Sequence, residues 1–169
     1  LAEADESDGS FLYLSPTVAM VTNIDLEHMD HYGSAERLEA TFLEFVNRVP
    51  FYGFTVLCQD HPTVQRLMPQ VRRRIVTYGF ARQAEYRATG LRQEGLQTTF
   101  RVHRGDEILG EISLRMPGEH NVSNAVGAVA LAMELDIPFD TVRDALHDFT
   151  GVQRRFTVLG QEAGVLVVD

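Results

Sequence analysis

Residues 18–30 read VAMVTNIDLEHMD, and this stretch indicates the fold class more clearly than any other part of the chain. Its apolar and β-branched start predicts a buried strand over Val18–Ile24. Asn23, Asp25, Glu27 and His28 crowd the end of that strand. Open α/β sheets build their sites at the carboxyl ends of their strands, so the stretch predicts such a sheet with a site after this strand. An ordinary polar loop, in which His28 is only hydrogen-bonded, is the alternative on these residues alone.

Outward from this stretch, strands and helices alternate. Ser34 can cap a helix that Pro50 ends. The apolar face of this helix is predicted to consist of Leu38, Phe42, Phe45, Val46 and Val49. Phe54–Cys58 and Arg74–Tyr78 are predicted strands, and a short helix starts at Pro62 between them. This order predicts parallel strands joined by right-handed crossovers.

The pattern changes in the second half, because residues 84–116 lack a helical period. Three antiparallel strands are predicted there, Tyr86–Leu91, Thr98–His103 and Ile108–Met116. A long helix over about Asn121–Leu135, a helix over 139–148 and a last strand at Val165–Val168 follow. The predicted fold class is therefore α/β, a mostly parallel sheet flanked by helices with a small appended antiparallel sheet.

Composition excludes several classes of protein. The 169 residues carry 15 basic and 24 acidic side chains, a net charge of −9, which disfavours nonspecific nucleic-acid binding. The single cysteine, Cys58, excludes an internal disulfide and fits a reducing, cytoplasmic compartment. No apolar run is long enough to span a bilayer, so no membrane partner is expected. The basic run Arg72–Arg74 is interpreted as a solvated helix end.

The chain also opens on an acidic cluster. Glu3, Asp5, Glu6 and Asp8 lie within six residues, and they repel one another unless solvent, a cation or a basic partner screens them. A frayed terminus is the simple interpretation. Apolar residues follow at positions 11–14, however, so the cluster is expected to be anchored to the core.

Six motifs occur in an order that resembles the Mur ligases over essentially the whole chain. They are EADESDGSF (3–11), VTNIDLEHMDHYG (21–33), PFYG (50–53), TYGF (77–80), PGEHNVSNAVGAVALA (117–132) and GVQRRF (151–156). One departure is Glu27, where the family usually has Asp. The resemblance implies an incomplete Mur ligase central domain. Residues 1–156 would form its later, ATP-binding part, and residues 157–169 the connection and first strand towards the C-terminal domain.

The resemblance implies an ATP- and Mg²⁺-dependent ligase of peptidoglycan synthesis that acts through an acyl phosphate. The form of residues 7–11 is similar to the member that joins L-alanine to UDP-N-acetylmuramate, rather than to the sister that adds a tripeptide to the same sugar. A noncatalytic nucleotide-binding fragment is a third interpretation, because the chain has no G-x-x-x-x-G-K-[ST] phosphate loop. In the family that loop would precede Leu1, so the isolated chain is expected to be inactive. The oligomeric state is left open.

For the metal and catalytic site, the resemblance implies that Glu3 and His28 hold magnesium. Asp5 or Glu6 could take the place of Glu3 if the acidic run aligns differently. Imidazole is an unusual magnesium ligand, so contact through water is a further alternative for His28. Asn23 could position water or substrate.

For the nucleotide, three polar residues open the predicted long helix. His120 and Asn124 share one helix face, and an Asn amide offers a donor and an acceptor that suit the edge of a base. Simple capping by Asn121 is the alternative. The resemblance implies that His120, Asn121 and Asn124 lie against the adenine of ATP. It also implies that Arg154 binds phosphate through its guanidinium fork, with Arg155 as the alternate.

Overall fold

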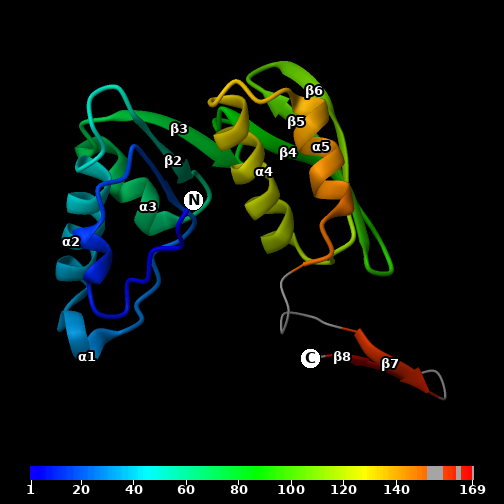
Figure 1. Cartoon of the computed structure of the whole chain (residues 1–169), viewed down its shortest axis with the longest axis horizontal. Helices are drawn as coiled ribbons and strands as arrows, with labels where there is room; N and C mark the ends of the chain where they lie inside the picture. The colour runs from blue at the N-terminus through cyan, green and yellow to red at the C-terminus, as the bar shows by residue number, and fades with distance from the viewer. Residues whose placement is uncertain (152–157, 163–164, 169) are drawn as a thin grey trace.

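The computed structural model describes residues 1–151, 158–162 and 165–168. One six-stranded sheet has the order β1-β2-β3-β4-β5-β6 (Figure 1). Its strands are β1 (Val18–Val21), β2 (Phe54–Cys58), β3 (Arg74–Gly79), β4 (Tyr86–Glu94), β5 (Gln97–Arg104) and β6 (Glu107–Leu114). The helices are α1 (Met29–Tyr32), α2 (Ala35–Asn47), α3 (Pro62–Leu67), α4 (Glu119–Met133) and α5 (Phe139–Asp148), with 3-10 turns η1 (Ser10–Tyr13) and η2 (Met68–Gln70). Strands β7 (Val158–Glu162) and β8 (Val165–Val168) form a separate antiparallel pair.

The sheet confirms the predicted α/β class. Strands β1 to β4 pair in parallel, and β4, β5 and β6 pair antiparallel. The antiparallel part continues the same sheet, because Tyr78 of β3 pairs with Tyr86 of β4. β1 ends at Val21, three residues before the predicted end at Ile24. Ile24 is buried without extending the ladder, so its apolar character indicated burial rather than strand.

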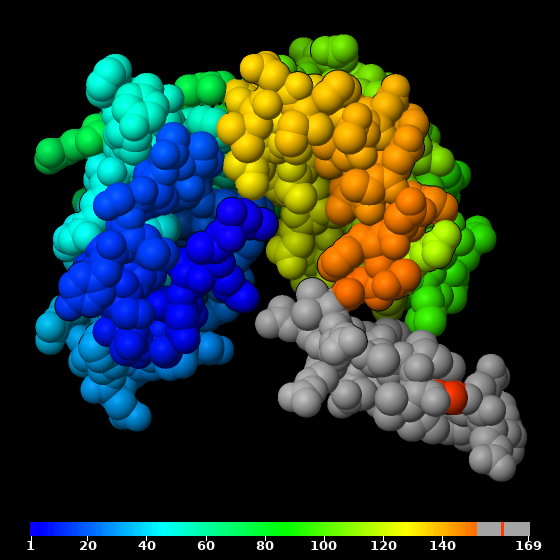
Figure 2. Space-filling view, viewed as in Figure 1, coloured from blue at the N-terminus to red at the C-terminus, as the bar shows by residue number. Residues whose placement is uncertain are grey.

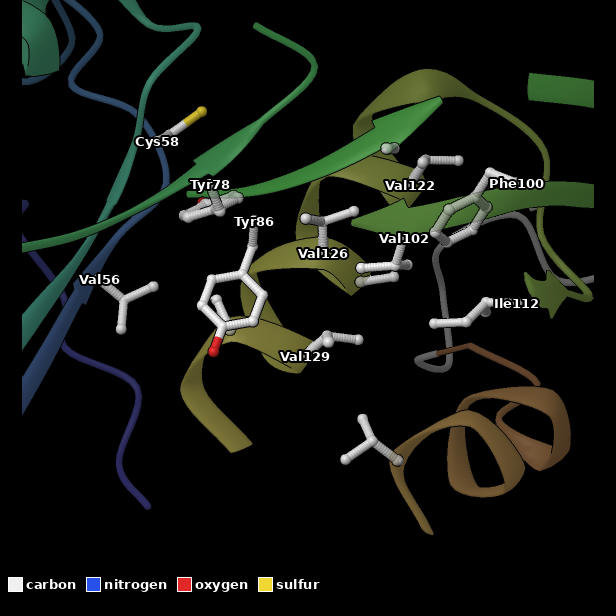
Figure 3. Packing of buried hydrophobic residues seen from close by; sticks show 14 of the residues in the cluster. Val56, Cys58, Tyr78, Tyr86, Phe100, Val102, Ile112, Val122, Val126 and Val129 are labelled. Atoms are coloured by element: carbon white, nitrogen blue, oxygen red, sulfur yellow. The ribbon is translucent and has the colours of Figure 1, made fainter. Parts of the chain in front are cut away.

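Helices cover both faces of the parallel part of the sheet. All five residues of β2 are buried, as in a strand that lies between two layers. Val56 and Tyr78 face α4 in one core cluster, which Figure 3 shows together with Val122, Val126 and Val129 of the helix. The second cluster joins the opposite sheet face to α2 and α3 through Ala19, Leu57, Leu38, Phe45 and Val64.

α4 packs against the sheet at Gly127, near the middle of the helix, with no room for a side chain. A Cβ at this position would lie 2.9 Å from Cζ of Tyr78 and would also overlap the end of Met20. The helix begins at Glu119, two residues before the predicted start. This earlier start places His120 and Asn121 in its first turn.

The interpretation of Arg72–Arg74 as a solvated helix end was wrong for two of the three residues. The Arg73 guanidinium donates to the carbonyl of Val49. Arg74 opens β3 and forms an ion pair with Glu134 at the end of α4. These partners lie far along the chain, so the local charge pattern gave no sign of them.

Glu134 connects α4 to three strands. Its side chain is 4% exposed and binds Arg74, Arg104 (2.7 Å) and the hydroxyl of Tyr86 (2.8 Å). Burial raises the pKa of this carboxyl, but the hydrogen bonds from Tyr86 and Arg74 and the charges of both arginines outweigh burial and leave the pKa of Glu134 below its ordinary value. Glu134 is therefore ionised, with its buried carboxylate paired to two partly exposed arginines.

Candidate functional site

The loops that follow β2 and β3 are fastened to each other at the carboxyl end of the sheet. Gln59 donates its backbone N–H to the carbonyl of Tyr78 (2.7 Å). The carboxylate of Asp60 accepts the backbone N–H groups of Phe80 (2.6 Å) and Ala81 (2.9 Å). These bonds satisfy backbone groups just where the strand ladder ends, so they make the two loops one rigid platform.

The loop that follows β1 meets this platform through a side-chain pair. Nε2 of His61, the residue that precedes α3, lies 3.3 Å from Oδ1 of Asp25. Nδ1 of His61 is buried and has no hydrogen-bond partner among the described residues. The sequence motif drew attention to Asp25, whereas no sequence signal singled out His61.

The acidic N-terminal segment is anchored through Phe11, as predicted, and it lies beside α1. Phe11 is buried and packs on the rings of Phe42 and Phe45, with centroids 5.2 Å and 5.0 Å away. The hydroxyl of Tyr32 donates to the carbonyl of Glu6. The carboxylates of this segment therefore lie next to the loop that carries His28.

Electrostatics connect Asp5 to His28. A hydrogen bond from the backbone N–H of Ser7 (2.8 Å) does most to lower the pKa of Asp5, and the charge of His28 lowers it further. His28 is exposed and has a left-handed backbone with φ of 55°. Glu3, the residue predicted for the metal, is also exposed, and Glu6 faces Tyr32 with its backbone.

The donor set at this point suits magnesium rather than a dedicated protein cage. No group of three or more His, Cys, Asp or Glu side chains that could hold a metal occurs within the described part of the chain. Magnesium usually keeps several waters and takes one or two carboxylates together with substrate phosphates. The exposed carboxylate of Asp5, which feels the charge of His28, fits that requirement, whereas Glu3 is exposed and makes no hydrogen bond or ion pair among the described residues.

The start of α4 lies at the same edge of the sheet. Oγ of Ser123 in its first turns is 4.0 Å from Sγ of Cys58, the last residue of β2. His120 and Asn124 are exposed there, whereas Asn121 is half-buried. Figure 2 shows the first residues of the chain (dark blue) and α4 (yellow) on the same face of the molecule.

Asn121 does not cap the helix, so that alternative was wrong. The N-cap is Gly118, which makes no side-chain cap bond. The amide nitrogen of Asn121 instead donates to the carbonyl of Pro117 (2.7 Å). One N–H of the Asn121 amide is therefore engaged, while its second N–H and its oxygen make no hydrogen bond among the described residues.

Part of the predicted site lies outside the described residues. Arg154 and Arg155 fall in the segment 152–157, as does the predicted domain boundary after residue 156. Within the described ranges, no helix has the length and apolar character needed to cross a membrane.

Comparison with known proteins assigns this arrangement to a family. The profile of the Mur ligase middle domain matches residues 2–132. The chain is 54% identical over 169 residues to the UDP-N-acetylmuramate–L-alanine ligase of Myxococcus xanthus, and 56% identical to that of an Anaeromyxobacter species. All of this chain is covered in both cases, but it spans only 36% and 37% of those relatives' lengths.

Solved structures share the fold. The UDP-N-acetylmuramate–alanine ligase of Thermotoga maritima matches with a TM-score of 0.84 at 26% identity, over 98% of this chain and 37% of that one. The MurF ligase of the same organism, solved in complex with ADP, matches with a TM-score of 0.79 at 20% identity, over 95% of this chain and 38% of that one. Because the middle-domain profile covers well over half of the chain, this protein belongs to the Mur ligase family.

Proposed function

We propose that this chain is the nucleotide-binding middle part of a cytoplasmic ligase that joins L-alanine to UDP-N-acetylmuramate in peptidoglycan synthesis. One observation carries the proposal. Identity of 54% to a ligase of that name extends over the whole chain, through the loop after β1 and the start of α4. The activity belongs to the longer protein, since the chain spans about a third of that relative.

The base of ATP would bind at the start of α4. Adenine carries an exocyclic amine that donates hydrogen bonds, and the free oxygen of Asn121 is an acceptor. Asn124, one turn further along, offers both a donor and an acceptor, and the ring of His120 can lie against the base. Guanine has an acceptor where adenine has its amine, so this site would favour ATP over GTP.

The phosphates would lie towards the loop after β1. Glu3 or Asp5, together with His28, would hold Mg²⁺, which supplies charge neutralisation at the transferring phosphoryl group. Arg154 would bind phosphate oxygens bidentately, because a guanidinium fork matches their geometry and keeps its charge at any working pH. Asn23 would position water or substrate beside them.

ATP is needed because a carboxylate is a poor electrophile. The sugar carboxylate would take the terminal phosphoryl group of ATP to give an acyl phosphate and ADP. The amine of L-alanine would then attack the acyl carbon, form the amide bond and release inorganic phosphate. Two anions, the sugar carboxylate and ATP, must meet in the first step. A cation and a nearby guanidinium would offset the repulsion between them.

The main rival is the ligase that adds a tripeptide to the same sugar. The UDP-N-acetylmuramate:L-alanyl-γ-D-glutamyl-meso-diaminopimelate ligase of Neisseria meningitidis matches this chain with a TM-score of 0.79 at 22% identity, which is a likeness of fold alone. The far higher identity to alanine ligases favours alanine. A noncatalytic nucleotide-binding protein is the other rival, supported by the absence of a phosphate loop in the printed sequence.

Phosphate release by the complete protein tests the proposal. With UDP-N-acetylmuramate, ATP and Mg²⁺ present, release should depend on L-alanine and should fall to the blank when any one component is left out. Release with the tripeptide but not with alanine would identify the sister ligase. Nucleotide binding without release on either substrate would identify a noncatalytic protein.

A further inference from the structure

We propose that His61 is a positioning residue whose imidazole holds the loop after β1, and with it His28, in the geometry that the phosphate end of the site needs. The inference deepens the proposed function and rests on it, because it concerns how the same site is held. His61 would be a further residue that supports this site, and it lies outside the sequence motif that follows β1.

His61 is itself held firmly. It follows Gln59 and Asp60, whose bonds to the end of β3 form the rigid platform described above. Its own carbonyl accepts the backbone N–H of Gln65 (3.0 Å) in α3. The side chain of Gln65 donates in turn to the carbonyl of Gln59, so this short loop is tied at each residue.

The loop over residues 22–28 is held by much less. Ile24 is buried, and the amide of Asn23 bonds only to the neighbouring hydroxyl of Thr22. At its far end the carbonyl of His28 accepts the backbone N–H groups of His31 (2.9 Å) and Tyr32 (3.2 Å) in the adjoining α1. Among the described residues, the contact between Asp25 and His61 is the one side-chain hydrogen bond that ties this loop to another element. Any displacement of Asp25 would therefore pass to His28, three residues further along.

The ring of His61 is well placed to act as such a tie. Its side chain is 22% exposed, against 62% for that of Asp25, so the ring is the better-packed partner of the pair. With Nδ1 buried and unpartnered among the described residues, the neutral tautomer that carries its proton on Nε2 avoids a buried unpaired N–H. That tautomer donates to Asp25 and fixes the direction of the bond.

His28 needs such support because of its backbone. A φ of 55° is costly for a residue with a side chain, and it persists only where the surroundings determine it. A glycine would adopt this positive φ without cost, but position 28 is a histidine. The pair of Asp25 and His61 supplies a long-range restraint just before the strained residue.

Kinetics of the complete protein test this role. His61→Leu removes the donor, His61→Gln keeps an N–H at the reach of Nε2, and Arg66→Gln is the matched control, since Arg66 lies on α3 but binds Glu39 (2.6 Å) instead. We expect His61→Leu to raise the Mg²⁺ concentration for half-maximal rate about fivefold, as for the loss of one partly exposed polar contact. KM for UDP-N-acetylmuramate should stay unchanged in all three variants, and His61→Gln should remain close to the wild type.

Hydrogen–deuterium exchange gives a readout that does not need activity. Amides of residues 22–31 should exchange faster in His61→Leu and in Asp25→Ala, which breaks the same bond from its exposed end, while amides of β2 stay protected. Unchanged exchange in both variants overturns the inference, as does an equal kinetic loss in His61→Leu and His61→Gln. If the wild type shows no ligase activity, the proposed function fails, and the exchange comparison alone decides whether His61 holds the loop.

Discussion

At the scale of single residues, the two asparagines that open α4 differ in what they already bind. Asn121 donates to Pro117 and is half-buried, whereas Asn124 is exposed. The same side-chain type is therefore expected to serve two purposes within one helical turn. We expect Asn121 to combine its structural bond with an acceptor for the base, and Asn124 to bind the ligand alone.

Alanine substitutions separate these purposes. Asn124→Ala should weaken ATP and ADP alike by about fivefold, the cost of one net hydrogen bond of about 1 kcal/mol, and should relax discrimination against GTP. Asn121→Ala should weaken both nucleotides and also destabilise the fold by about 1 kcal/mol, because the carbonyl of Pro117 loses its donor. Calorimetric titration and thermal unfolding of the complete protein measure the two effects. Normal stability in Asn121→Ala would contradict its structural role.

Sequence reasoning singled out residues whose pattern is local. The polar cluster after Val21 follows an apolar run, and the group 120–124 opens the predicted long helix, while the functional roles of both stay predictions from the resemblance. His61 and Glu134 were missed, because Asp25 lies 36 residues from His61 and Arg74 lies 60 residues from Glu134. Periodicity and local composition carry no information at such separations.

At the scale of elements, the periodic segments and the short helix that starts at Pro62 were predicted well, and the one-turn elements were not. α5 has the bounds that its apolar spacing predicted, and Ser34 caps α2 by accepting from the backbone N–H of Arg37 (3.3 Å). The one-turn elements η1 and α1 were not predicted, because a single turn is shorter than the helical period needs for detection. Their positions depend on the packing of Phe11 and Tyr32 instead.

The close packing at Gly127 leads to a prediction about the stability of a Gly127→Ala variant. In an open helix, Gly→Ala stabilises by up to about 1 kcal/mol, because alanine has the better helix propensity. Here the new Cβ would lie 2.9 Å from a ring atom of the fully buried Tyr78, so overpacking should outweigh propensity and cost about 1–3 kcal/mol. Urea unfolding followed by circular dichroism measures the change.

The control for this substitution lies on the same helix. Asn124→Ala adds helix propensity on the exposed face of α4 and should be neutral or slightly stabilising. A stabilised Gly127→Ala variant would mean that the helix can move away from the sheet, and the close approach would then not be a constraint.

At the scale of the whole molecule, the network around Glu134 joins the parallel and antiparallel parts of the sheet. Arg74 comes from β3, Tyr86 from β4 and Arg104 from β5, and all three meet one carboxylate at the end of α4. Burial is the main cause that raises the pKa of Tyr86, and the hydrogen bond to Glu134 raises it further, so its hydroxyl remains a donor at working pH. Ion pairs to Glu134 therefore hold the two parts of the mixed sheet together, in addition to the backbone hydrogen bonds between its strands.

Glu134→Gln should destabilise the chain by about 2 kcal/mol near neutral pH, since both arginines are partly exposed and retain some solvation. The pKa of Glu134 is lower in the folded than in the unfolded state, so ionisation stabilises the fold above the unfolded pKa. The difference between wild type and variant should shrink as pH falls below about 4. Urea unfolding across this range checks it, and Glu111→Gln, which removes an exposed ion pair with Arg92, should show little difference at any pH.

The isolated chain should release no phosphate from ATP with UDP-N-acetylmuramate, L-alanine and Mg²⁺. The reason is that the printed sequence lacks the lysine and hydroxyl of a phosphate loop, and in fact lacks lysine altogether. A steady-state assay against a no-protein blank decides the matter. Turnover above that blank would show that this third of the relatives' length carries a complete active site.

The shared carboxylate also imposes an order on evolutionary change. If Arg74 or Arg104 is lost first, Glu134 still has two partners, and the intermediate sequence survives. If Glu134 is lost first, Arg74 and Arg104 lose their shared counter-ion, only the more distant Glu85 (3.9 Å) still pairs with Arg104, and the Tyr86 hydroxyl loses its acceptor at the same time. Lineages should therefore drift at the two arginines while the acid persists, and replacement of the acid should be found mainly where both arginines have already gone.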